Sequence, residues 1–136
     1  MHVEGGCHCG YITYEAEVDP DTVRVCHCTD CQTLSGTAFR TNVSTSKAGF
    51  KLLTGQPKIY VKTAESGNKR AQGFCPECGT HIYAASVNDP QVYGIRVGTA
   101  RQRAELRPNK QIWCRSTLDW VTNLGSLPHN PKGLPR

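Results

Sequence analysis

Seven of the eight cysteines in this 136-residue chain fall into three short clusters. Cys114 stands apart from these clusters, which are Cys7-His8-Cys9, Cys26-His27-Cys28-Thr29-Asp30-Cys31 and Cys75-Pro76-Glu77-Cys78. Thiols this close in sequence are typical of turns that deliver metal ligands in pairs, because a tetrahedral zinc needs four donors at about 2.0 to 2.3 Å. The spacing therefore predicts bound zinc.

The clustered cysteines divide into a set of four and a set of three. If the Cys-x-Cys pair and the Cys-x-x-Cys pair close one tetrahedral site, its ligands are Cys7, Cys9, Cys75 and Cys78. The remaining set is one donor short of saturation and consists of Cys26, Cys28 and Cys31. Structural zinc sites are saturated, whereas a catalytic zinc keeps a position for water or substrate. We therefore expect one zinc for the fold and one for chemistry, the second held less tightly.

Three other interpretations of the cysteines stay open. They could form disulfides, although no export signal is seen at the start of the chain and neighbouring thiols make strained partners. The set of three could recruit His8, His27 or Cys114 as a fourth ligand and become a second structural site. It could also serve as a redox or metal-storage cluster.

Composition and charge limit the classes of function. A hydrophobic content of 38% is lean for a core, and structural zinc would add folding free energy on the order of 10 kcal/mol. The formal charge of +5 falls to about +2 with seven bound thiolates and two zinc ions, and the basic residues are spread along the chain. We therefore do not expect a nucleic-acid partner. The lack of a 20-residue apolar stretch or export signal predicts a soluble, cytoplasmic protein.

Short runs of β-branched and aromatic residues predict strands, with turn signals between them that include Asp19-Pro20 and Lys47-Ala48-Gly49. The predicted strands are Tyr11 to Val18, Thr37 to Val43, Lys58 to Lys62, Arg70 to Phe74, His81 to Ala85, Val92 to Val97 and Gln111 to Cys114. Single helical turns are expected at Asp30 to Leu34 and Ala100 to Leu106. The pattern predicts a mainly β fold, an antiparallel sheet or sandwich in one domain. We place this domain at residues 1–126 and expect residues 127–136 to form a Pro-rich tail.

Two glycines directly follow metal-ligand pairs. Gly10 follows Cys9 and Gly79 follows Cys78, and the second pair lies between two predicted strands, as in a zinc knuckle. A glycine there relieves the steric cost of a positive φ, so we expect one at both positions. Cys114, in a predicted strand, is expected to be a buried thiol.

Taken together, these motifs resemble the glutathione-dependent formaldehyde-activating enzyme family, also called the centromere protein V family, with its Mss-four-like fold. The resemblance covers nearly the whole chain and rests on Gly5-Gly6-Cys7-His8-Cys9-Gly10, Cys26-His27-Cys28-Thr29-Asp30-Cys31, Leu53-Thr54-Gly55 and Phe74-Cys75-Pro76-Glu77-Cys78-Gly79-Thr80. It implies an all-β fold around a structural zinc bound by Cys7, Cys9, Cys75 and Cys78. It also implies a second, catalytic-type zinc bound by Cys26, Cys28 and Cys31.

Family membership implies condensation of formaldehyde with glutathione to S-(hydroxymethyl)glutathione, a carbon-sulfur lyase activity. The implied partners are thus a small thiol and an aldehyde, with no membrane. Three thiolates give the zinc site a net negative charge and make the metal a weak Lewis acid, which favours activation of the thiol over polarisation of the carbonyl.

Further candidates follow from the chemistry of glutathione. Its two carboxylates predict basic clamps, for which the candidates are Arg40, Lys69, Arg70, Arg96 and Arg101. His8, His27 and His81 lie near the cysteines and could relay protons or pack beside the ligands. The alternative function is a zinc-stabilised binding module without catalysis, which engages protein or nucleic acid and would be favoured by a fourth protein ligand or a contiguous basic face.

Overall fold

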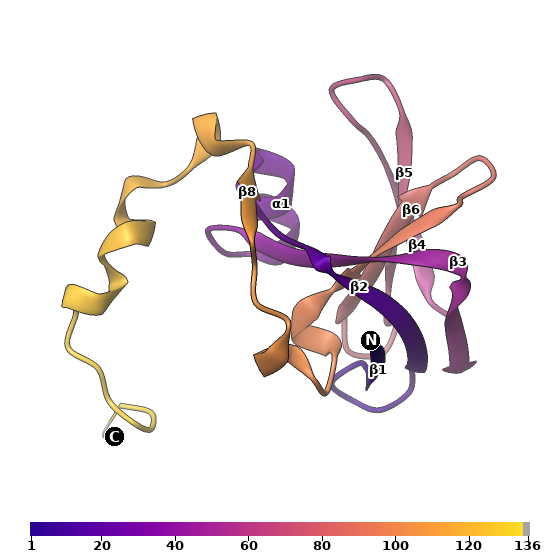
Figure 1. The fold of residues 1–136 in the computed structure, drawn as a ribbon, viewed down its shortest axis with the longest axis horizontal. Helices are drawn as coiled ribbons and strands as arrows, with labels where there is room; N and C mark the ends of the chain where they lie inside the picture. Colours follow the sequence, from indigo (N-terminus) through magenta and orange to yellow (C-terminus); the bar gives the residue numbers. More distant parts are fainter. Residues whose placement is uncertain (135–136) are drawn as a thin grey trace.

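The strands of this chain join into one sheet in the order β1-β2-β3-β7-β6-β5-β4, as seen in a computed structural model that describes residues 1–134 (Figure 1). The strands are β1 (His2–Gly6), β2 (Thr13–Cys26), β3 (Arg40–Thr54), β4 (Lys58–Thr63), β5 (Lys69–Phe74), β6 (His81–Ser86), β7 (Val92–Arg96) and β8 (Lys110–Ile112). Neighbouring strands along this order pair antiparallel, and β8 pairs parallel with the end of β2. The predicted mainly β, antiparallel, single-domain fold is confirmed.

Helical segments are short. The α-helix α1 (Thr29–Ser35) follows β2, and 3-10 helices occur at η1 (Val97–Thr99), η2 (Arg103–Glu105), η3 (Cys114–Ser116) and η4 (Asp119–Ser126). Gly36 ends α1 with a φ of 70°, a conformation that glycine adopts without steric cost. The segment after β8 runs away from the sheet (Figure 1). In the part of the chain that the structure describes, no helix is long and apolar enough to span a bilayer.

The two longest strands run through predicted turns. Asp19-Pro20 lies inside β2 and Lys47-Ala48-Gly49 lies inside β3. The β2–β3 register shifts between Ala16 and Val18 and again between Asp19 and Arg24. The two predicted turn sequences therefore form irregular positions within long strands and bend these strands, which is a common effect of β-bulges.

The core is formed by apolar side chains from both halves of the sheet. Its fully buried members include Val3, Ile12, Val23, Val43, Ile82, Ile95 and Leu106. Phe50 packs edge-on against Tyr14 and Tyr83, with ring centroids 5.7 and 5.4 Å apart. Cys7 and Cys75 belong to the same cluster, so the first and third cysteine turns are anchored to the core.

Cys114 differs from its predicted environment. The strand β8 ends at Ile112, Trp113 adopts a left-handed conformation with a φ of 57°, and Cys114 begins η3 as an exposed thiol. The prediction of a buried thiol on a strand was therefore wrong, because the backbone turns out of the sheet two residues earlier than the apolar pattern indicated.

Candidate metal centres

The first group of thiols joins two distant turns. Cys7 and Cys9 follow β1, whereas Cys75 and Cys78 lie between β5 and β6. Their four Sγ atoms lie within 4.8 Å of one another, with 3.6 Å between Cys7 and Cys9 and 3.8 Å between Cys9 and Cys75. This donor set is the one predicted from spacing, and four convergent thiols suit a tetrahedral thiophilic metal ion.

Both turns direct backbone amides toward sulfur. The amide of Ile12 donates to Cys7 Sγ at 3.2 Å, and that of Glu77 donates to Cys75 Sγ at 3.4 Å. Gly10 and Gly79 have φ values of 85° and 80°, which confirms the expected positive φ at both. N–H donors favour a thiolate over a thiol, so the turns are prepared for metal ligands.

The Thr80 hydroxyl contributes to the same preparation. Its Oγ1 lies 3.2 Å from Cys78 Sγ, and this hydrogen bond is the largest of the effects that lower the pKa of Cys78 to about 5. The hydrogen bond therefore favours the thiolate form of Cys78. Cys78 therefore supplies a ligand in its binding form.

The second group of thiols lies at the junction of β2 and α1. Cys26 ends β2, Cys28 is the N-cap of α1, and Cys31 lies in its first turn. Their Sγ atoms lie within 4.8 Å of one another, and Cys28 Sγ accepts the backbone N–H of Cys31 at 3.2 Å. The hydrogen bond between Cys26 and Cys31 lowers the pKa of Cys26 and raises that of Cys31, so Cys26 loses its proton first.

The predicted alternatives for a fourth ligand find no support in the geometry. Among the residues that the structure describes, no His, Cys, Asp or Glu joins the group of three at this separation. His27 is fully buried and its Nε2 pairs with Gln111 Oε1 at 2.8 Å. His8 and Cys114 are exposed. The group of three can therefore hold a metal ion with one coordination position left for another ligand.

A cavity of about 210 Å³ adjoins this group. It is lined by the three thiols and by five cationic side chains, which belong to Arg24, Arg40, Lys62, Arg70 and Arg96. No acidic side chain is among the described residues that line it. The charge of the cavity is thus suited to an anionic ligand.

The predicted basic clamps divide into two groups. Arg40, Arg70 and Arg96 line the cavity, but Lys69 does not, and Arg101 pairs with Glu4 at 2.9 Å elsewhere on the surface. The analysis of the sequence missed Arg24, which lies two residues before Cys26 on β2 and so faces the same side of the sheet. Strand alternation from Cys26 was the signal that could have identified it.

A second cavity of about 370 Å³ also adjoins Cys28 and shares Lys62, Ala64 and Trp113 with the first. Its walls carry both signs of charge. Lys62 pairs with Asp30 at 2.9 Å, and Arg115 pairs with Glu65 at 2.8 Å. The Cys28 thiol therefore lies between a cationic cavity and one of mixed charge.

His81 lines neither of these cavities. Its ring stacks on Phe74 with centroids 5.6 Å apart, and burial followed by the charges of Arg40 and Arg96 lowers its pKa. Neither His27 nor His81 lines a wall that contains the group of three. The structure therefore favours packing as the role of both.

Comparison with known proteins shows which family the chain belongs to. The profile of a family described as "Glutathione-dependent formaldehyde-activating enzyme" matches residues 2–116. A crystal structure of a Rhodobacter sphaeroides protein is similar with a TM-score of 0.61 and 19% sequence identity, over 79% of this chain and 98% of that chain. At that identity the structural likeness supports the fold alone. The matched residues include both cysteine groups and all eight strands described, and the chain belongs to the glutathione-dependent formaldehyde-activating enzyme family.

Proposed function

We propose that this protein is a zinc-dependent carbon-sulfur lyase that condenses formaldehyde with glutathione to S-(hydroxymethyl)glutathione. The observation that carries the proposal is the group of three thiols, which has no fourth ligand among the described residues and opens onto two cavities. If both metal sites were purely structural, each would be expected to have four protein ligands. Family membership supplies the reaction class.

The two cysteine groups take different roles in this proposal. Cys7, Cys9, Cys75 and Cys78 hold a structural zinc, since four sulfur donors saturate a tetrahedral ion. Cys26, Cys28 and Cys31 hold the second zinc and are the catalytic residues. When bound there, zinc would supply positive charge that stabilises a substrate thiolate.

The chain's own residues then have little covalent work to do. The thiol sulfur forms a bond to the aldehyde carbon, the carbon-oxygen π bond breaks, and the thiol proton ends on the product hydroxyl. No oxidant or reductant is needed. The cavity walls bind and orient the reactants, and this positioning is the contribution we assign to them.

The mixed-charge cavity suits the thiol substrate. Glutathione carries one ammonium and two carboxylates, and the walls offer Asp30 and Glu65 to the ammonium and Lys62 and Arg115 to one of the carboxylates. Trp113 provides an apolar surface between the two cavities. Glutathione bound there would have its sulfur near Cys28.

A cytoplasmic location belongs to the same proposal. All eight cysteines are free in the structure, and reduced glutathione and free thiols are maintained in the cytosol. Oxidation of either group to disulfides would remove the ligands that the proposed reaction needs.

Exchange NMR on a mixture of glutathione and formaldehyde tests the proposed function. Hydroxymethyl exchange is compared without protein, with wild type, with Cys28→Ser and with Cys114→Ser, a matched control at an exposed cysteine outside both groups. We expect acceleration by wild type and Cys114→Ser and none by Cys28→Ser. A wild-type protein with two zinc ions per chain that gives only the buffer rate contradicts the proposal.

A further inference from the structure

Two arginines beside the group of three thiols are almost completely buried. Arg40 on β3 is 6% exposed and Arg96 on β7 is 9% exposed. Their guanidinium groups meet at Gln72 Oε1, which accepts Arg40 Nη1 at 3.3 Å and also accepts Arg96 Nη2. Arg96 Nη1 donates to Asn42 Oδ1 at 2.6 Å. All these acceptors are neutral amides, so two positive charges lie side by side without a carboxylate partner.

Several donors of this pair have no acceptor. Arg40 Nε, Arg40 Nη2 and Arg96 Nε are buried and make no hydrogen bond within residues 1–134. Burial, followed by the positive charge of Arg40, lowers the pKa of Arg96 to about 9. Buried charges and buried donors without partners are both unfavourable, and a bound anion would relieve both.

The surroundings of the pair offer no counter-charge of the required size. No acidic side chain is among the described residues that line the cavity of about 210 Å³, to which both arginines contribute. Another cavity, of about 350 Å³, is lined by Arg40, His81 and Arg96 and is likewise without an acidic wall residue in the described chain. Three thiolates around a divalent ion carry one net negative charge and Lys62 already pairs with Asp30, so the four arginines of the cavity keep an excess of positive charge.

We propose that Arg40, Gln72 and Arg96 form a binding subsite for a carboxylate of a reactant at the group of three cysteines. Guanidinium groups match the two oxygens of a carboxylate, and Gln72 fixes both forks in one orientation. The role of the ligand as a reactant rests on the proposed function, whereas carboxylate binding itself does not.

Formaldehyde has no carboxylate, so two sources remain. One is glutathione, and the other is an aldehyde that itself carries a carboxylate, such as glyoxylate. The cationic cavity, at about 210 Å³, is smaller than typical ligand pockets of about 300 to 1,000 Å³. The thiol sulfur would bond to the aldehyde carbon of glyoxylate, the carbon-oxygen π bond of the aldehyde would break, and the thiol proton would end on that oxygen. The carboxylate of glyoxylate would be unchanged.

Binding is tested on the zinc-loaded full chain labelled with ¹⁵N-arginine. Acetate is titrated as the probe with acetamide as its neutral counterpart, and the guanidinium signals are assigned with Arg40→Lys and Arg96→Lys. We expect saturable shifts of the Arg40 and Arg96 signals with acetate alone, both in wild type and in Cys28→Ser. The subsite is overturned if the Arg40 and Arg96 signals move no more than the signal of exposed Arg101. It is also overturned if the shifts vanish in Cys28→Ser, because acetate then binds at the metal and not at the arginines. If an arginine variant misfolds, through-bond assignment of the guanidinium signals in wild type replaces it, so the wild-type titration still decides the question.

Exchange rates then identify the source. Arg96→Lys keeps the charge but loses the fork, so the rate should fall about tenfold or more for the reactant whose carboxylate it binds. Loss with glyoxylate but not with formaldehyde assigns the aldehyde. Loss with glutathione but not with one of its two monoamides assigns the thiol and the carboxylate that is bound. Equal loss for every pair, or no loss, overturns the assignment. If acetate binds but no pair reacts faster than in buffer, the proposed function fails and the subsite stands.

Discussion

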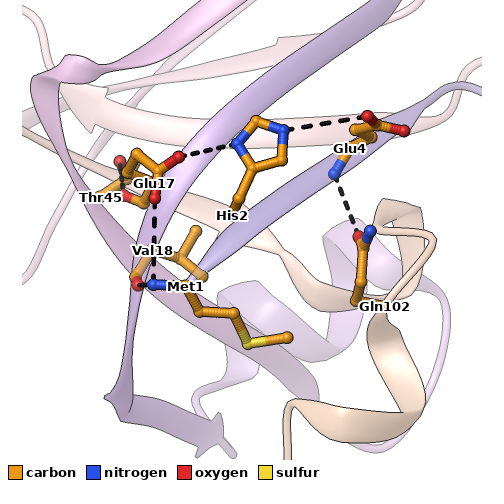
Figure 2. Close-up of polar contacts among 7 residues, drawn as sticks. All are labelled: Met1, His2, Glu4, Glu17, Val18, Thr45 and Gln102. Atoms are coloured by element: carbon orange, nitrogen blue, oxygen red, sulfur yellow. Dashed lines mark hydrogen bonds and ion pairs between the residues drawn. The ribbon is translucent and has the colours of Figure 1, made fainter.

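His2 lies between two carboxylates at the start of β1 (Figure 2). Its Nδ1 is 2.7 Å from Glu17 Oε1 and its Nε2 is 3.8 Å from Glu4 Oε1. The terminal ammonium of Met1 donates to Val18 O at 3.0 Å beside them. The hydrogen bond with Glu17 is the main reason that the pKa of His2 lies above its ordinary value of 6.5. The contacts with Glu17 and Val18 join the start of β1 to β2.

The raised pKa predicts a pH-dependent contribution to stability. Protonated His2 is favoured in the folded state, so the contribution is fully present below the unfolded pKa and is lost as pH rises through the folded pKa. Wild type should therefore lose more stability than His2→Gln between about pH 6 and pH 8.5. Urea unfolding at the two pH values measures this, with the affinity tag placed at the C-terminus to leave Met1 free. Equal losses in both proteins contradict the assignment.

Cys78→Ser tests the saturated group at a single atom. The substitution removes one of four sulfur donors and the thiolate stabilised by Thr80, so we expect loss of that zinc and of the cooperative thermal transition. Calorimetry and zinc analysis measure both effects, with Cys114→Ser as the control. A sharp transition with full zinc content in Cys78→Ser is incompatible with a structural metal there.

At the residue scale, the sequence was informative where chemistry imposes fixed spacing. The positive φ values of Gly10 and Gly79 were predicted because sulfur ligands require inward amides. The exposure of Cys114 was not predicted, because the backbone leaves the sheet after Ile112, and the burial of Arg40 was not, because it depends on how distant strands cover that residue. The spacing of residues along the sequence carries no information about which distant strands bury them.

At the scale of elements, the turn between β3 and β4 depends on Gly55. It has a φ of 82°, and a Cβ there would lie 2.6 Å from Tyr11 O and 2.8 Å from Ile12 Cγ1. Gly55→Ala should therefore cost about 2 kcal/mol, from the strained backbone and the clash together. Gly98→Ala is the matched control, because a Cβ at Gly98 meets nothing within 4 Å and its φ is not positive. Equal unfolding free energies for the two variants contradict this account of the turn.

The element predictions succeeded where a strand is short and bounded by turns. The predicted strands at Lys58 to Lys62 and Arg70 to Phe74 match β4 and β5 within one residue at each end. β1 was missed because two of its five residues are glycines and β2 is the one strand it pairs with in the described chain, apart from an isolated bridge between Gly5 and Ala100. A strand that forms because a neighbouring strand pairs with it need not show apolar alternation in its own sequence.

At the scale of the whole molecule, residues 118–134 are separate from the sheet (Figure 1). Their hydrogen bonds within the described chain join residues of this same segment, and Trp120, Leu124 and Leu127 are about half exposed. Truncation after Thr117 should therefore leave the zinc content unchanged and shift Tm by less than about 3 °C. A larger decrease would show that the segment supports the sheet. The predicted domain boundary at residue 126 remains a prediction.

The architecture as a whole was predictable only in part. Cysteine spacing indicated which turns must converge, and the first group of thiols does join β1 with the β5–β6 turn. The strand order and the parallel pairing of β8 with β2 were not predictable, because they depend on contacts between distant segments, such as Asn42 with Arg96 and Arg24 with Lys110. The cationic cavity depends on the same pairings, since Arg24, Arg70 and Arg96 come from three strands.

The most direct test of the two-centre account is the zinc content and sulfur coordination of Cys28→Ser beside wild type, from elemental analysis and X-ray absorption. We expect about two zinc ions per chain in wild type and about one in Cys28→Ser, the latter with four sulfur ligands and an unchanged thermal transition. Two zinc ions retained in Cys28→Ser, or a single zinc in wild type reconstituted with excess metal, would contradict the separation into one structural and one reactive centre.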